Sequence, residues 1–270
     1  MTTGTSPRRD GHAAARESAA PAPRFHVDEP IPREGRGAPF DLPAGAATHA
    51  VRVLRLAVGD PLVLFDGHGG EHRATIVAAG RHRATVRIDG FDPVERETPV
   101  ATTLVMSVIA ADAMDFAVRK AVELGAHAVV PVVAARSQGA LDGERAERRV
   151  AHWRAIAVAA CEQCGRNRVP PVAAPVRLLT WLAEFEGENG TAALLVPGAS
   201  RSLAALAASV PPGCLLIGPE GGFTGDERAH ALRLGIEPVH LGRRILRAET
   251  AALAALATFN AVAGDARQDA

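Results

Sequence analysis

The pattern of apolar residues changes near residue 100 of this 270-residue chain. Before that point, short runs rich in β-branched residues are separated by Gly, Pro and Asp, which is typical of a small barrel or sandwich. The runs expected to form strands are Phe25–Val27, Val51–Leu54, Leu62–Phe65, Arg73–Val77 and Arg83–Ile88. The sequence therefore predicts an N-terminal β domain.

After residue 100, buried strands alternate with helices. The expected strands are Leu104–Ile109, Ala128–Val133, Ala192–Val196, Leu215–Ile217 and Val239–Leu241, and the clearest helices are Asp112–Leu124, Glu144–Cys164 and Glu249–Val262. Such alternation predicts a mainly parallel sheet covered on both faces. We expect a disordered tail at 1–23, the β domain at 24–100, an α/β domain at 101–264 and a second tail at 265–270.

Composition narrows the class of protein. Apolar residues make up 47% of the chain, which excludes wholesale disorder, and 30 basic residues balance 30 acidic ones, so any nucleic acid must bind a local patch. Three cysteines spread over this length make no disulfide framework, and we expect a reduced cytoplasm. Pro211 and Pro212 interrupt the uncharged run Ser202–Pro219, which predicts a helix, a turn and a strand instead of a membrane span.

Two short motifs match metal or redox patterns without the context that these patterns need. His68–His72 matches the zinc pattern H-x-x-E-H, but Gly67, Gly69 and Gly70 indicate a turn between strands, where the histidines share no helix face. Cys161–Cys164 matches C-x-x-C at the end of a helix, where the dipole disfavours a thiolate. We expect no metal site and a structural cysteine pair.

The segment Leu215–Thr224 runs from a strand into a glycine-rich loop and then into a helix that begins with a capping box, Thr224 and Glu227. Ligands bind at the carboxyl ends of strands in such sheets. The spacing matches neither G-x-G-x-x-G nor a phosphate-binding loop with its lysine, so the bare backbone beside Glu220 suits a neutral or cationic ligand. A plain strand-to-helix turn is the alternative.

A second loop of this kind, Leu241–Thr250, follows the last expected strand. Arg243, Arg244 and Arg247 come just before a helix start, which favours a phosphate-facing site. A solvated basic turn has the same pattern.

Basic residues also recur in the β domain. Arg81, Arg83 and Arg87 alternate with other positions so that one strand face is basic, and Arg52 lies on another expected strand, with Arg55 just after it. This arrangement is compatible with an RNA-facing patch and, more simply, with a solvated strand face.

Together these segments resemble the RsmE family, SPOUT-class methyltransferases of small-subunit ribosomal RNA. The resemblance is carried by Phe25–Asp28, His49–Leu56, Gly59–Gly67, Glu123–Gly125, Glu162–Arg166, Ile217–Phe223 and Arg244–Ala251. It covers about residues 24–264, and the last two segments are highly specific in combination.

The resemblance implies an α/β fold with an N-terminal PUA-like β-barrel that binds RNA and a C-terminal SPOUT domain with a trefoil knot. It implies a cytoplasmic homodimer that binds S-adenosyl-L-methionine in the knot, with no metal and no membrane. The implied reaction is methylation of N3 of a specific uridine of 16S rRNA within the assembled small ribosomal subunit.

The candidate site residues form three groups. The resemblance itself assigns the cofactor walls and Arg166, and the arginines of the third group come from the strand and loop patterns described above. The cofactor walls would be Leu195, Val196, Pro197, Gly198, Ile217, Gly218, Gly221, Leu241, Gly242, Ile245, Leu246 and Arg247. The catalytic candidates are Arg166 and Arg247, which would orient the base and stabilise its anion, and Glu220, a proton acceptor. The RNA-binding candidates are Arg52, Arg55, Arg81, Arg83, Arg87, Arg243 and Arg244.

Two positions depart from the family's pattern. Cys164 stands where serine is usual, and Ala111–Met114 stands where a lysine and a glycine often accompany the aspartate. That lysine would supply a cation to the RNA or to the active site, and its absence here puts this role in doubt. Three alternatives stay open: a catalytically silent RNA-binding dimer, a methyltransferase with another RNA target, and a dinucleotide enzyme, which the absent G-x-G-x-x-G disfavours.

Overall fold

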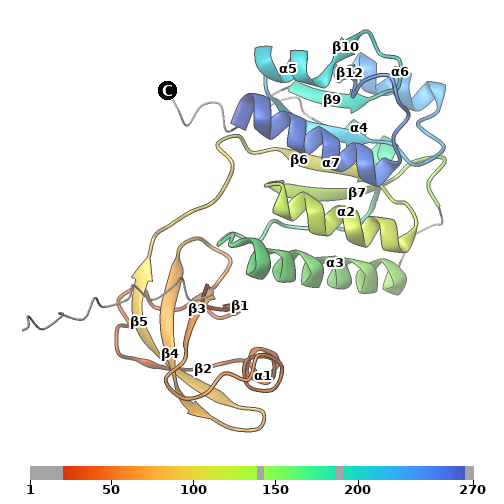
Figure 1. Cartoon of the computed structure of the whole chain (residues 1–270). Coiled ribbons are helices and arrows are strands. Elements are labelled where there is room, and N and C mark those ends of the chain that lie inside the picture. The colour runs from red at the N-terminus through yellow and green to blue at the C-terminus, as the bar shows by residue number, and fades with distance from the viewer. Residues whose placement is uncertain (1–20, 139–142, 186–190, 265–270) are drawn as a thin grey trace, which may run out of the picture.

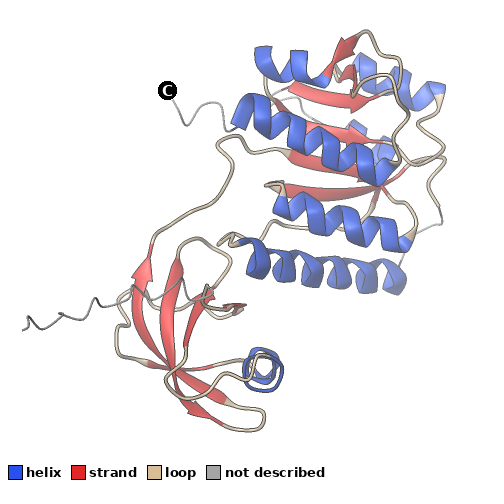
Figure 2. Ribbon diagram, viewed as in Figure 1, coloured by secondary structure: helices blue, strands red, loops and turns tan. Residues whose placement is uncertain are grey.

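The structure is a computed structural model that describes residues 21–138, 143–185 and 191–264. It contains a small β unit built from N-terminal residues and a larger α/β unit (Figure 1). Figure 2 shows strands in both units, with most of the helices in the second. The tails expected at 1–23 and 265–270 lie almost entirely outside the described residues.

The β unit is a five-stranded sheet with the spatial order β1-β3-β4-β5-β2. β1 pairs with β3 in parallel, and the other neighbours are antiparallel. Alternate side chains of the central strands form one buried face with α1 and η1, because residues two apart share a face. The elements are β1 (Arg24–His26), β2 (Pro39–Asp41), α1 (Ala44–Thr48), the π-helical turn η1 (His49–Val53), β3 (Pro61–Phe65), β4 (Glu71–Ala79) and β5 (Ala84–Asp92).

The strand expected at Val51–Leu54 is wrong, because α1 continues into η1 and this segment is mostly helical. Ala47 and Ala50 are fully buried in the core of the β unit, whereas Val53 is 65% exposed. The small side chains let the helical segment pack closely against the sheet. Burial of that face therefore decides the conformation over the β-propensity of the two valines.

The α/β unit is built around a seven-stranded sheet with the order β10-β12-β9-β11-β6-β7-β8, in which every pair is parallel. Its strands are β6 (Thr103–Ser107), β7 (Ala128–Val133), β8 (Val176–Arg177), β9 (Thr191–Leu195), β10 (Arg201–Ser202), β11 (Pro212–Ile217) and β12 (Glu237–His240). Its helices are α2 (Ala111–Glu123), α3 (Gly143–Cys164), α4 (Leu178–Ala183), α5 (Leu203–Ser209), α6 (Gly225–Arg233), α7 (Ala248–Phe259) and the π-helical turn η2 (Asn260–Gly264).

Helices cover both faces of this sheet, as the alternation of strands and helices predicted. Leu104 and Met106 of β6 pack into one core with α2, α3, α5 and α7, and Val105 between them packs into the other core with α4 and α6. The run from residue 202 to 219 forms a helix, a turn and a strand as predicted, although β11 begins earlier than expected, at residue 212.

A partly buried polar network joins the two units. Arg24 of β1 donates hydrogen bonds to Glu71 and to Asn167 Oδ1, both at 2.5 Å. Arg96, in the segment that connects the sheets, donates to Glu71 at 3.0 Å and to the carbonyl oxygen of Gly165 at 2.9 Å. Burial raises the pKa of Glu71, but the hydrogen bonds from Arg96 and Arg24 outweigh it and hold this pKa below its usual value. The segment after α3 is thereby held against the β unit.

The two short motifs lie where the sequence analysis placed them. His68 lies in the turn between β3 and β4, and Cys161 and Cys164 lie in the last turn of α3. Within the described residues, no three His, Cys, Asp or Glu side chains are grouped to hold a metal ion. None of the helices described is long and apolar enough to cross a membrane.

Candidate functional site

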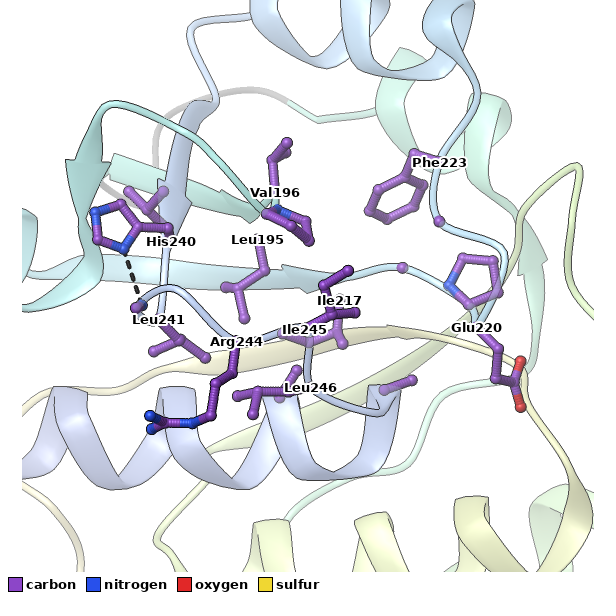
Figure 3. Close-up of a pocket in the computed structure, with 18 of the residues that line it drawn as sticks. Leu195, Val196, Ile217, Glu220, Phe223, His240, Leu241, Arg244, Ile245 and Leu246 are labelled. Carbon is purple, nitrogen blue, oxygen red and sulfur yellow. Dashed lines mark hydrogen bonds between the residues drawn. The ribbon is translucent and has the colours of Figure 1, made fainter.

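A pocket lies where three neighbouring strands, β9, β11 and β12, reach their carboxyl ends. Its walls are residues 195–197 at the end of β9, 217–220, 222 and 223 at the end of β11, 239–242 and 244–246 around the end of β12, and Ala248 and Ala251 at the start of α7. Figure 3 shows Leu195, Ile217, Leu241 and Leu246 gathered around the centre of this pocket. This end of a parallel sheet is where α/β proteins bind ligands, so the pocket is the candidate site.

The loop after β11 depends on two glycines. Gly222 has a φ of +67° and donates a hydrogen bond to Pro219 O at 2.8 Å, which closes a tight turn. The ring of Phe223 lies against Gly218, where an added Cβ would come within 3.1 Å of the ring carbons. The backbone at Gly218 therefore stays bare, and the aromatic ring supports it from one side.

The predicted capping box begins α6 and fixes the end of this loop. Thr224 Oγ1 accepts from the backbone N–H of Glu227 at 3.2 Å, and Glu227 Oε2 accepts from the N–H of Thr224 at 2.7 Å. Glu227 is buried, and its Oε1 accepts from the N–H of Ala135 at 2.7 Å. One carboxylate thus connects the loop after β11 with the loop after β7.

The loop after β12 also needs a glycine. Gly242 has a φ of +99°, and its N–H donates to His240 Nδ1 at 2.9 Å, the dashed line in Figure 3. Ile245 lines the pocket and is 85% exposed. The loop therefore presents an apolar side chain and bare backbone to a ligand.

Charged side chains lie at opposite ends of an apolar hollow. The Glu220 carboxylate points away from the central apolar residues on one side, and the Arg244 guanidinium extends along α7 on the other (Figure 3). Arg228 and His240 add polar atoms to the lining. This arrangement fits a ligand that combines a flat apolar ring with charged groups, held largely by backbone atoms and aliphatic side chains.

The structure brings most of the predicted cofactor residues together. Those that line the pocket are Leu195, Val196, Pro197, Ile217, Gly218, Leu241, Gly242, Ile245 and Leu246. Gly198, Gly221 and Arg247 adjoin lining residues but are not part of the lining. Arg247 is the N-cap residue of α7, and its side chain is exposed.

The catalytic candidates do not lie together. Glu220 lines the pocket and Arg247 adjoins it, but Arg166 lies outside the lining and is only 3% exposed. The Arg166 guanidinium is bound by Glu97 and by the carbonyl oxygens of Val122 and Ala126. In this arrangement its charge is paired within the chain, and Arg166 lines a second hollow with Gly125, Cys164 and Asn260. Its contact with the base stays a prediction.

The arginines predicted to bind RNA are spread over several places. Arg52 lies in η1, and Arg55, just after it, has a φ of +57°. Arg81 and Arg83 lie in the exposed turn between β4 and β5, and Arg87 of β5 donates to Asp89 at 2.9 Å. Arg243 and Arg244 lie in the loop after β12. Of the seven arginines predicted, only Arg244 lines the pocket.

Several lining residues were missed by the sequence analysis: Pro219, Gly222, Phe223, Arg228, Val239, His240, Ala248 and Ala251. Most of them are sequence neighbours of residues that were predicted, so extending each predicted loop by a few residues would have included them. Arg228 lies on α6, one turn after the capping box. The available signal in the sequence was its place in the helix that directly follows the predicted ligand loop.

Comparisons with known proteins match both units. The RNA methyltransferase domain family matches residues 96–260, and the RNA methyltransferase PUA domain family matches residues 42–89. A protein named ribosomal RNA small subunit methyltransferase E from Synechocystis is 34% identical, over 78% of this chain and 69% of the relative. The protein of that name from Mycobacterium tuberculosis is 33% identical, over 86% of this chain and 88% of the relative.

Solved structures resemble the whole arrangement. The crystal structure of ribosomal RNA small subunit methyltransferase E from Neisseria gonorrhoeae bound to S-adenosyl methionine is 36% identical, with a TM-score of 0.83 over 90% of this chain and 99% of that one. A putative methyltransferase from Legionella pneumophila in complex with the same compound is 32% identical, with a TM-score of 0.84 over 90% of this chain and 99% of that one.

Proposed function

Because the chain belongs to the ribosomal RNA small subunit methyltransferase E family, we propose that it methylates 16S rRNA with S-adenosyl-L-methionine as the methyl donor. The observation that carries this proposal is the pocket at the carboxyl ends of β9, β11 and β12, whose lining includes nine of the twelve residues that the family resemblance assigns to the cofactor. The fold of the chain, an α/β SPOUT-class domain that follows a PUA domain, is the fold of that family.

The residues present fit this donor. Aliphatic side chains such as Leu195, Ile217 and Leu246 can enclose the adenine ring, and the bare backbone at Gly218 allows close approach. Arg244 and Arg228 can pair with the carboxylate of the amino acid end, and Glu220 adds a negative charge near a cationic ligand. When bound, the donor supplies an electrophilic methyl group on a sulfonium centre.

We extend the proposal to N3 of a specific uridine as the site of methylation. This nitrogen carries a weakly acidic proton and lies on the pairing edge, so the base must be unpaired before it reacts. Glu220 would take the proton, and a fixed arginine charge would stabilise the resulting uracil anion. Arg247 stays a candidate for that charge because it adjoins the pocket, whereas Arg166 is proposed to hold the segment after α3 in place.

The β unit would hold the RNA. We propose domain limits at 24–100 and 101–264, supported by the end of the first sheet at Asp92 and the start of the second at Thr103. Arg52, Arg55, Arg81 and Arg83 are exposed in this unit, so their charges are accessible to phosphates. The substrate would be the assembled small subunit in the cytoplasm.

A homodimer and a trefoil knot complete the proposal. Phe116 is 40% exposed on α2, which packs beside the alanine-rich α7, and a second subunit could cover this apolar face. The chain that follows β12 passes beside the loop after β11 before it enters α7, and both segments line one pocket. The knot is proposed for this crossing.

Calorimetric titration of the purified chain with S-adenosyl-L-methionine, and in parallel with NAD, is the first test. We expect saturable binding of the methyl donor and no heat from NAD. Small ribosomal subunits that lack the modification are then incubated with the enzyme and donor, and the methylated nucleotide is mapped by mass spectrometry of 16S rRNA fragments.

Each alternative gives a different result. Donor binding with methylation of 16S rRNA at another atom or nucleotide would contradict the uridine-N3 assignment. Donor binding with no methylation of any RNA would favour a catalytically silent dimer. Binding of NAD alone would support a dinucleotide enzyme.

A further inference from the structure

Arg136 is a basic residue that contacts the wall of the pocket from a distant part of the chain. It lies three residues after the end of β7, and its Nη1 donates a hydrogen bond to the carbonyl oxygen of Gly221 at 2.8 Å. Gly221 stands between Glu220 and Gly222, both of which line the pocket. The guanidinium of Arg136 therefore lies against this glycine-rich loop.

The strand order explains how Arg136 reaches this loop. β6 lies between β7 and β11, and neighbouring strands are about 4.8 Å apart, so β7 and β11 are separated by about 10 Å. A long side chain is needed to cross the carboxyl end of β6. An added Cβ on Gly221 would lie 3.3 Å from both Cβ and Cδ of Arg136, so the aliphatic part of this side chain packs directly on the glycine.

The backbone on both sides of Arg136 is anchored. The N–H of Ala135 donates to the buried carboxylate of Glu227 at 2.7 Å. Ser137 closes a turn, because its Oγ accepts from the N–H of Ala134 and its own N–H donates to Ala134 O, both at 3.0 Å. Such anchoring holds Arg136 in position before any substrate arrives, which is the condition for electrostatic stabilisation by a fixed charge.

The charge of Arg136 is available. The residue is exposed, and it forms no ion pair at 4.0 Å or less with any carboxylate in the described part of the chain. One hydrogen bond to Gly221 leaves most N–H groups of the guanidinium to solvent. Glu220, the residue before Gly221, is also exposed, and its carboxylate points out of the apolar hollow (Figure 3). A cation and a proton acceptor thus flank the same short loop without neutralising each other.

We propose that Arg136 is a catalytic residue that binds the pairing edge of the target uracil together with Glu220, an inference that rests on the methyltransferase activity proposed above. In uracil, N3–H lies between two carbonyl groups. Arg136 would donate to one of these oxygens, and Glu220 would accept the N3 proton. In cytosine, N3 carries a lone pair instead of a proton and would face the carboxylate unfavourably, so the pair also selects uracil.

The charges balance in this step. The N3 proton passes to the Glu220 carboxylate, and the electron pair of the broken N–H bond remains on the base as an anion shared by N3 and the two oxygens. That pair forms the bond to the methyl carbon, and the pair of the former sulfur–carbon bond stays on sulfur. Arg136 stabilises the negative charge on the base while it exists.

The test compares three variants of Arg136 with a matched control. Arg136→Ala removes the charge and the hydrogen bond, Arg136→Gln keeps an amide donor for Gly221 without the charge, and Arg136→Lys keeps the charge. The control is Arg148→Ala, which removes an exposed arginine of α3 that pairs with Glu144 at 3.0 Å. For each protein, donor affinity is measured by calorimetry and methylation of unmodified small subunits is followed over a range of pH.

We expect Arg136→Ala and Arg136→Gln to lower kcat by about a hundredfold, which is the effect of removing one fixed donor to a developing anion. Donor affinity should stay within about twofold of wild type. The rise of kcat with pH should move to higher pH in both variants, because the base must lose its proton without the nearby positive charge. Arg136→Lys should recover part of kcat, and Arg148→Ala should match wild type.

Three results would overturn the inference. Wild-type kcat and an unshifted pH profile in Arg136→Gln would show that the charge is not used. Loss of donor binding in both Arg136→Ala and Arg136→Gln would show that the residue only supports the pocket wall. A wild-type enzyme that binds the donor but methylates no uridine would overturn the proposed function together with this inference, whereas the first two results leave the proposed function standing.

Discussion

Arg166 Nε lies 2.9 Å from Glu97 Oε1, and the same guanidinium donates to the carbonyl oxygens of Val122 and Ala126 at 2.9 and 3.0 Å. One side chain therefore connects the segment between the two sheets with the end of α2 and the residues that follow it. Because the arginine is almost completely buried, these partners compensate its charge in place of water. Arg166 therefore holds the segment between the two sheets against the end of α2.

Arg166→Ala should destabilise the protein by about 3 to 5 kcal/mol, because it leaves the Glu97 carboxylate and two carbonyl groups without their partner. Urea unfolding measures this change. Methylation is assayed at urea concentrations well below the unfolding midpoint of the variant, where the protein remains folded. The methylation rate should fall only slightly there, although the free energy of unfolding falls strongly. An unchanged midpoint with methylation lost would restore Arg166 to the reacting centre.

Local segments could be predicted from the sequence, and long-range contacts could not. The loop after β11 was predicted because its glycines and the capping box of Thr224 and Glu227 are signals within a few residues. The partners of Arg166 lie 40 or more residues away, and no local pattern indicates them. Arg136 was missed for the same reason, since its contact with Gly221 depends on the strand order.

The N-terminal prediction failed where tertiary packing overrode propensity. Val51 and Val53 lie on either side of Arg52 in a short run of β-branched and aliphatic residues, and this run predicted a strand. The structure instead buries Ala47 and Ala50 of a helical segment in the core of the β unit. Alanines favour a helix at 44–50 and valines favour a strand at 51–53, and only the tertiary packing decides between these two local preferences.

His72 should make the stability of the protein depend on pH below neutrality. Burial lowers the pKa of this histidine below its ordinary value of 6.5. As pH falls through 6.5, the unfolded chain binds a proton that the folded chain does not, so the free energy of unfolding decreases until the folded pKa is reached. The slope from this group is at most about 1.4 kcal/mol per pH unit.

His72→Phe is expected to flatten this part of the profile, because it removes the titrating ring. Phenylalanine suits the position, since the His72 ring already packs against Phe91 and its buried Nδ1 has no hydrogen-bond partner among the described residues. Urea unfolding between about pH 5 and 8 gives the comparison. His82→Phe, in the exposed turn between β4 and β5, is the control and should keep the wild-type slope. Equal slopes in wild type and His72→Phe would contradict the prediction.

The three cysteines should differ in reactivity. Burial raises the pKa of Cys161 to about 12 and that of Cys214 to about 11, so neither forms much thiolate at pH near 8. Cys164 is only partly buried. Iodoacetamide should therefore modify Cys164 in the native protein, and Cys161 and Cys214 only after unfolding in urea. Peptide mass spectrometry shows which thiol reacts, and rapid native modification of Cys161 would contradict its burial.

Gly242→Ala should weaken binding of S-adenosyl-L-methionine. Gly242 lines the pocket with a φ of +99°, a conformation that alanine adopts only with strain. Relief of this strain would move the loop after β12 and with it Leu241 and Ile245, so we expect at least about a tenfold loss of affinity in calorimetry. Strain alone should cost about 1 to 2 kcal/mol of stability.

Gly59→Ala separates the loss of donor affinity from the loss of stability. Gly59 has a φ of +96°, and, as at Gly242, an added Cβ would meet no atom within 4 Å, but it lies in the turn before β3, away from the pocket. Both variants should therefore lose similar stability in thermal unfolding, while only Gly242→Ala loses donor affinity. If Gly59→Ala weakened binding as much as Gly242→Ala, the loss would reflect general destabilisation, and the assignment of the loop after β12 to the donor would fail.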